Sequence, residues 1–177
     1  RWGGQWMSRE TGLLARLEPG LDTATLHFGT SPESLSETAD GGLSSSSVKL
    51  ARAGENLLME RMQENYRERL VPVAPAPAAG DVCLAGRYRS VELQADIVIE
   101  CRDGGTYLWA EGFLGTGRPE IVRPAGPDIW IVVTRRAMDA PAPGDWTLVA
   151  ARDAAGHIIG LTLGCWLARG IHYARCG

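Results

Sequence analysis

Pro72-Val-Ala-Pro75-Ala-Pro77-Ala-Ala-Gly80 interrupts an otherwise strand-rich sequence near its middle. Proline cannot donate to a sheet ladder, and closely spaced prolines favour an extended, semi-rigid chain. The stretch therefore predicts a Pro/Ala-rich linker. We place this linker at residues 74–82, between a first domain at 1–73 and a second at 83–177.

Short alternating segments lie on both sides of this linker, and turn residues separate nearly all of them. They are residues 13–17, 25–28, 48–52, 57–60, 97–101, 107–111, 129–133, 146–151, 158–163 and 171–173. Short strands at regular spacing favour an antiparallel sandwich or barrel over a parallel sheet with helices. A small antiparallel module removes its unpaired edges most simply by closing. We therefore predict an all-β protein of two tandem antiparallel β-barrels.

The two halves also echo each other in sequence. Gly4-Gln-Trp-Met-Ser8 has the same Gly-x-aromatic-x-Ser pattern as Gly86-Arg-Tyr-Arg-Ser90. Residues 54–59, Gly-Glu-Asn-Leu-Leu-Met, resemble residues 126–131, Gly-Pro-Asp-Ile-Trp-Ile, as a turn that leads into an apolar strand. Internal similarity of this kind predicts a duplicated module.

Residues 60–70 allow a helical alternative, because Met62, Tyr66 and Leu70 recur at four-residue spacing. The same segment fits two strands joined by a turn at residues 63–65. The strand pattern on both sides favours the second interpretation.

The composition argues against several classes of function. The chain has 177 residues, 45% of them hydrophobic, and 18 basic against 21 acidic side chains that are interspersed. This balance gives no electrostatic reason to expect nucleic acid or an anionic membrane as a partner. Apolar runs such as 129–133 are far shorter than the roughly 20 residues of a membrane-spanning helix. No signal-peptide pattern opens the chain, which starts with Arg1, so we expect a cytoplasmic protein recorded as a fragment or a processed chain.

Four cysteines are widely spaced, with no Cys-x-x-Cys pair to suggest zinc or redox chemistry. Cys101 follows Ile97 and Ile99 in an alternating run, and Cys165 continues a run in the same way. A small buried hydrophobe belongs at such positions. We therefore expect reduced core cysteines, with disulfides as the alternative in an exported protein. The four are Cys83, Cys101, Cys165 and Cys176.

Two short patterns look like an active site of the serine β-lactamase type: Ser46-Ser-Val-Lys49 and His27-Phe-Gly29. Ser-x-x-Lys chemistry needs the lysine one helical turn after the serine. Here Val48 and Leu50 alternate with Lys49, which predicts a loop running into a strand, where residues three apart point to opposite faces. The His element also precedes the serine, and no Tyr-x-Asn follows. We therefore predict no catalytic residue in this chain, against the hypothesis of an independent hydrolase.

The other polar candidates are weaker. His157 and His172 lie 15 residues apart without a paired carboxylate spacing, so solvent-facing or structural roles are expected rather than metal ligation. Gly115-Thr-Gly117 lacks the following helix that a phosphate site needs, and a turn explains it. We expect neither a metal nor a cofactor.

A free-standing binding protein is the main rival hypothesis, with each barrel holding a small apolar ligand. A hollow barrel needs small inward residues, whereas large aromatic residues would plug it. Plugging is the favoured interpretation. The expected plugs are Trp6, Tyr88, Trp109, Trp130, Trp146 and Trp166.

The connection 134–145, Thr-Arg-Arg-Ala-Met-Asp-Ala-Pro-Ala-Pro-Gly-Asp, is far longer than an ordinary hairpin loop. It contains two arginines, a methionine, a carboxylate at Asp139, and prolines that lower the entropy of ordering it. The alternative is an ordinary surface loop without a function. Its length favours a protruding functional loop.

Several segments resemble bacterial serine D-aminopeptidases. The middle domain of that family is resembled by 4–8, Thr11-Gly-Leu-Leu-Ala-Arg-Leu17, Thr25-Leu-His-Phe-Gly-Thr30, 44–50 and Glu55-Asn-Leu-Leu-Met-Glu-Arg61. The third domain is resembled by Leu84-Ala-Gly-Arg-Tyr-Arg-Ser90, the 134–145 connection and Ala168-Arg-Gly-Ile-His-Tyr-Ala-Arg175. The resemblance covers nearly the whole chain, although these segments carry no catalytic fingerprint.

The resemblance implies two lipocalin-like eight-stranded barrels that follow an N-terminal catalytic domain of the penicillin-recognising type. It implies that the 134–145 loop enters the cleft of that domain and limits it to small D-amino-acid peptides or amides with a free amino terminus. Asp139 is then the carboxylate expected to recognise the ammonium group. Arg135 and Arg136 would brace the loop or meet a substrate carbonyl, Met138 would lie at the tip, and the parent chain could form a homodimer.

Overall fold

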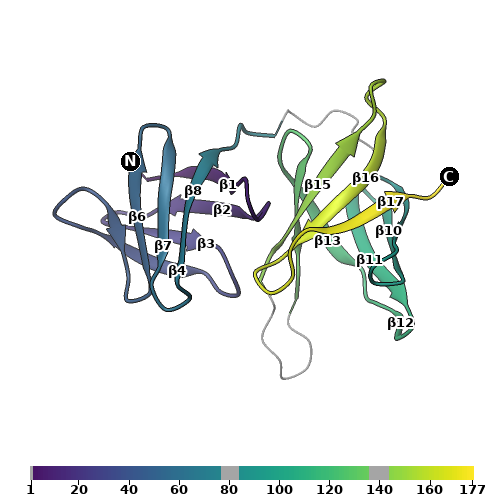
Figure 1. Ribbon diagram of the computed structural model, residues 1–177, viewed down its shortest axis with the longest axis horizontal. Coiled ribbons are helices and arrows are strands. Elements are labelled where there is room, and N and C mark those ends of the chain that lie inside the picture. The colour runs from purple at the N-terminus through teal and green to yellow at the C-terminus, as the bar shows by residue number, and fades with distance from the viewer. Residues whose placement is uncertain (1, 77–83, 136–143) are drawn as a thin grey trace. The chain divides into compact units, whose positions relative to one another are not determined.

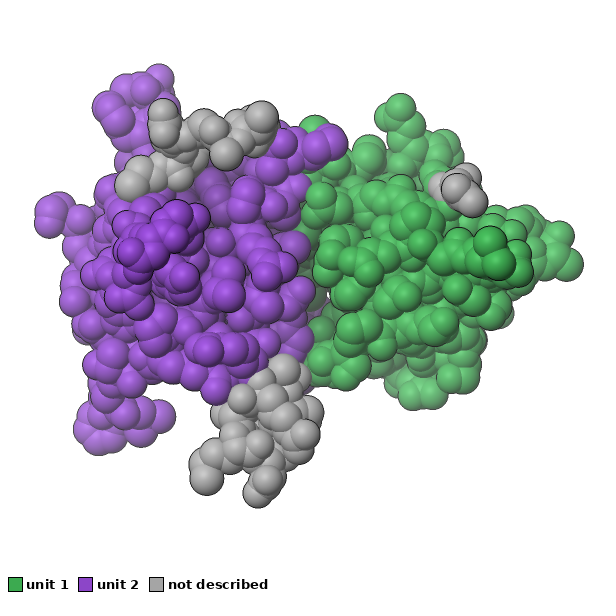
Figure 2. Space-filling view, turned by 180° about the vertical axis from the view of Figure 1, so that it is seen from behind, with its two compact units in different colours: residues 1–74 green, residues 75–177 purple. Residues whose placement is uncertain are grey.

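The computed structural model describes residues 2–76, 84–135 and 144–177. Within these ranges every regular element is a β-strand. The chain divides into two compact units, Arg1–Ala74 and Pro75–Gly177, which Figure 2 shows in different colours. The predicted all-β class is therefore confirmed. The described part contains no helix long and apolar enough to cross a bilayer.

The first unit is a closed barrel of eight strands, each paired with its chain neighbours (Figure 1). The last strand pairs with the first through Trp6 and Pro72, which closes the ring. The strands are β1 (Gly4–Ser8), β2 (Leu14–Pro19), β3 (Thr23–His27), β4 (Glu33–Glu37), β5 (Leu43–Ser44), β6 (Val48–Ala53), β7 (Asn56–Arg61) and β8 (Tyr66–Pro72).

The helical alternative for residues 60–70 is wrong. β7 and β8 form a hairpin in which Arg61 is paired with Tyr66. Asn65 has a φ of 48°, a left-handed conformation that asparagine tolerates in a tight turn. The turn that the sequence placed at 63–65 is therefore confirmed.

The second unit contains a sheet of nine strands, and the pairing of β10 with β11 closes eight of them into a second barrel. The ninth, β12, is a two-residue strand appended to β11. The strands are β9 (Gly86–Ser90), β10 (Ala95–Arg102), β11 (Gly105–Gly112), β12 (Gly115–Thr116), β13 (Glu120–Gly126), β14 (Ile129–Val133), β15 (Trp146–Arg152), β16 (Ile158–Gly164) and β17 (Ile171–Arg175).

Apolar side chains occupy the interiors of both barrels. Inward positions alternate with outward ones, as the pleat of a strand requires. In the first barrel Leu26, Leu35, Leu57 and Leu70 are each 0% exposed. The second barrel is filled by Leu84, Tyr88, Ile97, Ile99, Leu108, Val122, Trp130, Val132, Leu148, Ile158, Leu161, Leu163 and Tyr173. This filling is what a plugged barrel needs, and it disfavours the hypothesis of a ligand-holding barrel.

The predicted aromatic plugs are correct except for two. Trp6, Tyr88 and Trp130 are buried, and Trp146 packs against the core cluster. Trp109 instead lies on the outer face, where it pairs with Val98 and its indole N–H donates to the Glu111 carboxylate at 2.9 Å. Trp166 lies in the turn between β16 and β17, so it cannot reach the interior from a strand.

The first sequence echo marks equivalent strands. β1 and β9 are the first strands of the two barrels, with Trp6 and Tyr88 turned inward. Both begin at a glycine with positive φ, 138° at Gly4 and 150° at Gly86. A Cβ at Gly4 would lie 3.0 Å from the Trp6 ring, and one at Gly86 would lie 3.2 Å from the Arg175 guanidinium. Glycine therefore lets each barrel fold a large side chain against its own first strand.

The second echo does not mark equivalent strands. Gly54 lies in the turn between β6 and β7, the sixth and seventh strands of the first barrel. Gly126 ends β13 and leads into β14, the fourth and fifth strands of the second barrel in chain order. The similarity therefore reflects turn chemistry, in which Gly and Asp tolerate the required φ values, rather than shared position.

The placement predicted for two cysteines is wrong. Cys101 is exposed, because β10 runs past the barrel end after Ile99 and turns at Asp103. Cys165 is only partly buried, because β16 ends at Gly164, one residue before it. Both thiols are free, as is that of Cys176. Cys83 lies outside the described residues.

Candidate functional site

The Ser46 region has the extended geometry that the sequence predicts. Ser46 lies in a bend before β6, Lys49 lies on that strand, and both are exposed. The neighbouring hydroxyls of Ser45 and Ser47 both donate to the Glu33 carboxylate. These hydrogen bonds therefore hold the segment that leads into β6 against Glu33. A strand does not hold a lysine amine against a hydroxyl three residues earlier.

Polar side chains close one end of the first barrel. The Ser8 and Tyr66 hydroxyls both donate to the Glu68 carboxylate. Burial and the adjacent Glu68 raise the pKa of Tyr66 to about 12, so it remains a neutral donor. Arg61 lies 3.6 Å from Glu33 on the same end of the barrel. Because Ser8 and Tyr66 are bonded to Glu68 and Arg61 lies beside Glu33, we interpret these groups as a structural closure of the barrel.

The three histidines are each engaged with a neighbour. His27 contacts Glu18 at 3.1 Å, His157 contacts Asp153 at 3.3 Å, and His172 contacts the Thr162 hydroxyl at 3.0 Å. Among the described residues no group of three or more His, Cys, Asp or Glu is placed to hold a metal ion. Gly115 and Thr116 form the short β12, as part of a hairpin.

Several polar side chains meet at the base of the 134–145 connection. The Arg135 guanidinium donates to the Glu120 carboxylate at 2.9 Å and to the Pro119 carbonyl. Arg118 donates to the other oxygen of Glu120 at 2.6 Å and also to the Arg135 carbonyl. We call Arg118, Glu120 and Arg135 the loop-base clamp. It joins the start of β13 to the first limb of the connection.

The second limb is fixed as well. The Thr134 hydroxyl donates to the Gly144 carbonyl across the base. Gly144 has a φ of 86°, which glycine adopts without steric cost. Val132 is paired with Trp146 just below, the last backbone pair of the β14–β15 hairpin. The two limbs therefore leave the barrel side by side and bonded to each other.

Electrostatics keep the clamp in its charged form. Partial burial of Glu120 opposes ionisation, but the hydrogen bonds from Arg118 and Arg135 outweigh it and hold the pKa of Glu120 below its ordinary 4.5. The Glu120 side chain is 15% exposed, and the two arginines are more open. Charge-assisted bonds of this kind are stronger than neutral ones.

We expect Glu120→Gln to lower the free energy of unfolding by about 1 kcal/mol at pH 7, because the arginine partners are solvent-screened. Since the folded-state pKa lies below the unfolded one, this contribution is present above about pH 4.5 and is lost as the pH falls through the folded value. Urea unfolding at pH 7 and at about pH 3 should show the deficit shrinking in acid.

Glu100→Gln is the matched control, because Glu100 is half-exposed and lies 3.6 Å from Arg102. It should change stability little at either pH. An equal deficit for Glu120→Gln at both pH values would contradict the ionic clamp.

Of the residues that the sequence proposed for specificity, the structure describes Arg135 alone. Arg136, Met138 and Asp139 lie outside the described residues. Sequence reasoning missed Arg118 and Glu120, because Glu120 begins β13, a strand that it did not recognise, and Arg118 lies two residues before that strand. Their only signal was the Arg118-Pro-Glu120 run directly before an alternating segment.

Comparison with known proteins places this geometry in a family. The model of "D-aminopeptidase, domain B" matches residues 1–174, nearly the whole chain. The chain belongs to the D-aminopeptidase domain B family. A D-aminopeptidase from Cereibacter sphaeroides (strain ATCC 17029 / ATH 2.4.9) is 50% identical over 174 residues, which are 98% of this chain and 34% of that protein. D-aminopeptidases from Brucella melitensis biotype 2 and Brucella ovis are 42% identical over 175 residues, 98% of this chain and 33% of each relative.

The match confirms the D-aminopeptidase resemblance drawn from the sequence. The chain spans about a third of the length of these curated relatives. The region that the family model matches folds into two filled barrels in this chain, and the loop-base clamp lies on the second.

Proposed function

We propose that this chain is the specificity-setting accessory part of a serine D-aminopeptidase. In the parent enzyme an N-terminal domain of the penicillin-recognising type supplies the nucleophile. The 134–145 connection enters the cleft of that domain and restricts it to small peptides or amides with a free N-terminal D-residue, such as D-alanine. Family membership and the one-third coverage of the relatives support a division of labour of this kind.

The observation that carries the proposal is the loop-base clamp. A specificity loop has to be held in position, because binding discrimination falls when the contact groups are loose. Arg135 binds Glu120 and Pro119 of its own barrel. We therefore assign Arg135 the bracing role, which leaves Arg136, Met138 and Asp139 to face the cleft.

Asp139 is proposed to recognise the substrate ammonium group. A carboxylate in a site from which water is excluded forms a strong charge-assisted hydrogen bond with a free ammonium. An acylated nitrogen carries no charge and leaves the carboxylate without its partner, which is costly. The same group therefore attracts the correct substrate and rejects the wrong one.

The test is Asp139→Asn in the parent enzyme. We expect the ratio of kcat/KM for a D-alanine amide to that for its N-acetyl derivative to fall roughly tenfold to hundredfold, the equivalent of one hydrogen bond to a charged group. Asp145→Asn is the matched control, since Asp145 is an exposed carboxylate at the base of the same connection. If the ratio survives Asp139→Asn unchanged, the role of Asp139 is wrong.

A further inference from the structure

The dipeptide Asp-Gly occurs at two places in this chain, and each time a second glycine follows it. The two tripeptides are Asp40-Gly-Gly42 and Asp103-Gly-Gly105. In such a sequence the amide nitrogen of the first glycine can attack the aspartate side chain, because no side chain on that glycine hinders the approach. Since the two tripeptides are identical, the fold decides whether one of them reacts faster than the other.

Asp103 and Gly104 form the two-residue turn between β10 and β11, where Arg102 is paired with Gly105. Their φ values of 51° and 73° are those of a type I′ hairpin turn. Glycine adopts this left-handed conformation without steric cost, whereas an aspartate is strained in it. The hairpin therefore favours a glycine after Asp103, and the strain at Asp103 lowers the cost of leaving the turn conformation.

Neither reacting group at this turn is held in place. Asp103 and Gly104 are both exposed. The described part of the chain offers the Asp103 carboxylate no ion pair and the Gly104 N–H no acceptor. The neighbouring Arg102 lies 3.6 Å from Glu100 instead. A change confined to the turn is therefore enough to bring the Gly104 nitrogen to the Asp103 side chain.

The corresponding groups at Asp40 are held by hydrogen bonds. The Gly41 N–H donates to the Thr38 carbonyl at 2.9 Å, and the Thr38 N–H donates to the Gly42 carbonyl at 3.0 Å. The Thr38 hydroxyl donates to the Asp40 carboxylate and holds the pKa of Asp40 below its ordinary 3.8, so less of this carboxyl is in the neutral form that loses water. Steric room is alike, because a Cβ at Gly41 or at Gly104 would meet no heavy atom within 4 Å. Hydrogen bonding is therefore what distinguishes the two sites.

We propose that Asp103 is a site of spontaneous isoaspartate formation in the folded chain, whereas Asp40 is protected. The Gly104 nitrogen forms a bond with Cγ of Asp103, and a carboxyl oxygen leaves as water together with the amide proton and the carboxyl proton. Water then opens the five-membered succinimide ring at one of its two carbonyls. Opening at Cγ restores Asp103, and opening at the main-chain carbonyl leaves the peptide running through the side chain. The net change is an isomerisation that needs no reactant besides water.

The modification acts on the hairpin that closes the second barrel, since the pairing of β10 with β11 completes the ring. An isoaspartyl residue adds one carbon atom to the main chain of a two-residue turn, so the type I′ geometry that matches the twist of the strands is lost. We expect the amides of residues 101–107 to exchange faster in the modified chain and those of 129–133 to exchange as before. The modification is independent of the proposed function, because it uses no residue of the 134–145 connection.

Prolonged incubation of the folded chain in mildly acidic buffer, followed by digestion and mass spectrometry, tests the proposal. An isoaspartyl peptide keeps its mass but separates from the aspartyl form by chromatography. We expect isoaspartate to accumulate at Asp103 at least about fivefold faster than at Asp40, the factor that corresponds to one net hydrogen bond. In denaturant the two sites should convert at similar rates. Equal rates in the folded chain, or conversion of Asp103 in denaturant alone, would overturn the proposal.

Variants at both sites assign the chemistry to the turn. Asp103→Asn forms the same succinimide with loss of ammonia in place of water, so this variant should gain the mass difference between an amide and a carboxyl group. Asp40→Asn is the matched control and should gain it more slowly by a similar factor. Asp103→Glu would need a six-membered ring, which closes far more slowly, so the isomerised peptide should be absent. With thermal unfolding as the check on folding, an Asp103→Asn chain that keeps its mass, or one that converts no faster than Asp40→Asn, would refute the reactivity assigned to this turn.

Discussion

Replacing Tyr88 by alanine is expected to lower the free energy of unfolding of the second barrel by about 3 to 5 kcal/mol, the cost of removing a large aromatic side chain from a packed core. Tyr88 is fully buried, and its hydroxyl donates to the Leu84 carbonyl at 2.8 Å. The Arg175 guanidinium lies 5.5 Å from the ring centroid. One substitution therefore removes the plug of the barrel and its ring contact with Arg175 of the last strand.

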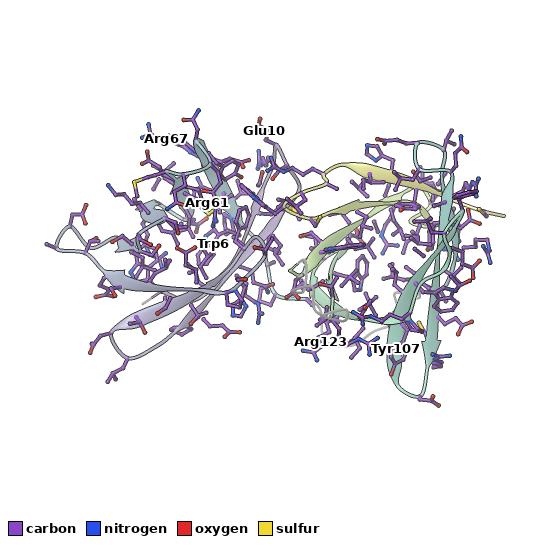
Figure 3. The ribbon with its side chains drawn as sticks, turned by 90° about the horizontal axis from the view of Figure 1, so that it is seen from below. Trp6, Glu10, Arg61, Arg67, Tyr107 and Arg123 are labelled. Atoms are coloured by element: carbon purple, nitrogen blue, oxygen red, sulfur yellow. The ribbon has the colours of Figure 1, made fainter. Side chains whose placement is uncertain are left out.

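Urea unfolding followed by hydrogen exchange in each barrel measures this effect. Tyr88→Phe separates the hydroxyl from the ring and should cost about 1 kcal/mol. Tyr107→Ala is the matched control, because Tyr107 lies on the outside of the second barrel (Figure 3). There the Arg102 guanidinium carbon lies 5.2 Å from the centroid of the Tyr107 ring. A loss at Tyr107 as large as that at Tyr88 would contradict the assignment of Tyr88 as the interior plug.

Tyr88 belongs to a motif that shows which features of the fold could be predicted from the sequence. The Gly-x-aromatic-x-Ser pattern was found as a repeat of the two halves, although residues 4–8 and 86–90 were not among the expected strands. It marks β1 and β9 because it combines a glycine that permits positive φ with a side chain that must be buried. Both requirements are local, so a short motif is enough to predict them. Most apolar strands were found for a similar reason, since alternation over a few residues reports directly on burial.

Two other missed strands, β4 and β13, lack such a local signal. β4, Glu-Ser-Leu-Ser-Glu, contributes only Leu35 to the core, and its strand conformation is imposed by its neighbours β3 and β5. β13 contains Pro124 at a register shift, which a sequence pattern takes for a loop. Because β13 was missed, so was the loop-base clamp, whose carboxylate is 15 residues from Arg135. Contacts of this kind depend on strand order, which sequence alone did not provide.

Replacing residues 136–143 of the parent enzyme by Asn-Gly should produce the largest change in specificity. We expect the kcat/KM preference for a free amino terminus to fall roughly a thousandfold or more. A site built to hydrogen-bond a polar substrate group rejects analogues without that group by factors of this size or greater, and removal of the loop should abolish the rejection. The barrel should tolerate the change, because the limbs at Thr134 and Gly144 are already bonded and Arg135-Asn-Gly would form a three-residue hairpin loop that ends in glycine, a common type. The measurement is the kcat/KM ratio for free and N-acetylated D-alanine amides, with thermal unfolding as the check on folding.

Two outcomes of the loop replacement have distinct meanings because the clamp and the replaced segment are separate. If the shortened enzyme keeps its Tm and its substrate preference, the 134–145 connection has no part in specificity, and the clamp serves the barrel alone. If it loses preference for the free amine but gains activity on larger or acylated substrates, the connection excludes substrates by filling the cleft. Asp139→Asn removes the charge and keeps the bulk, so a smaller loss in that variant measures recognition of the ammonium group separately from steric exclusion.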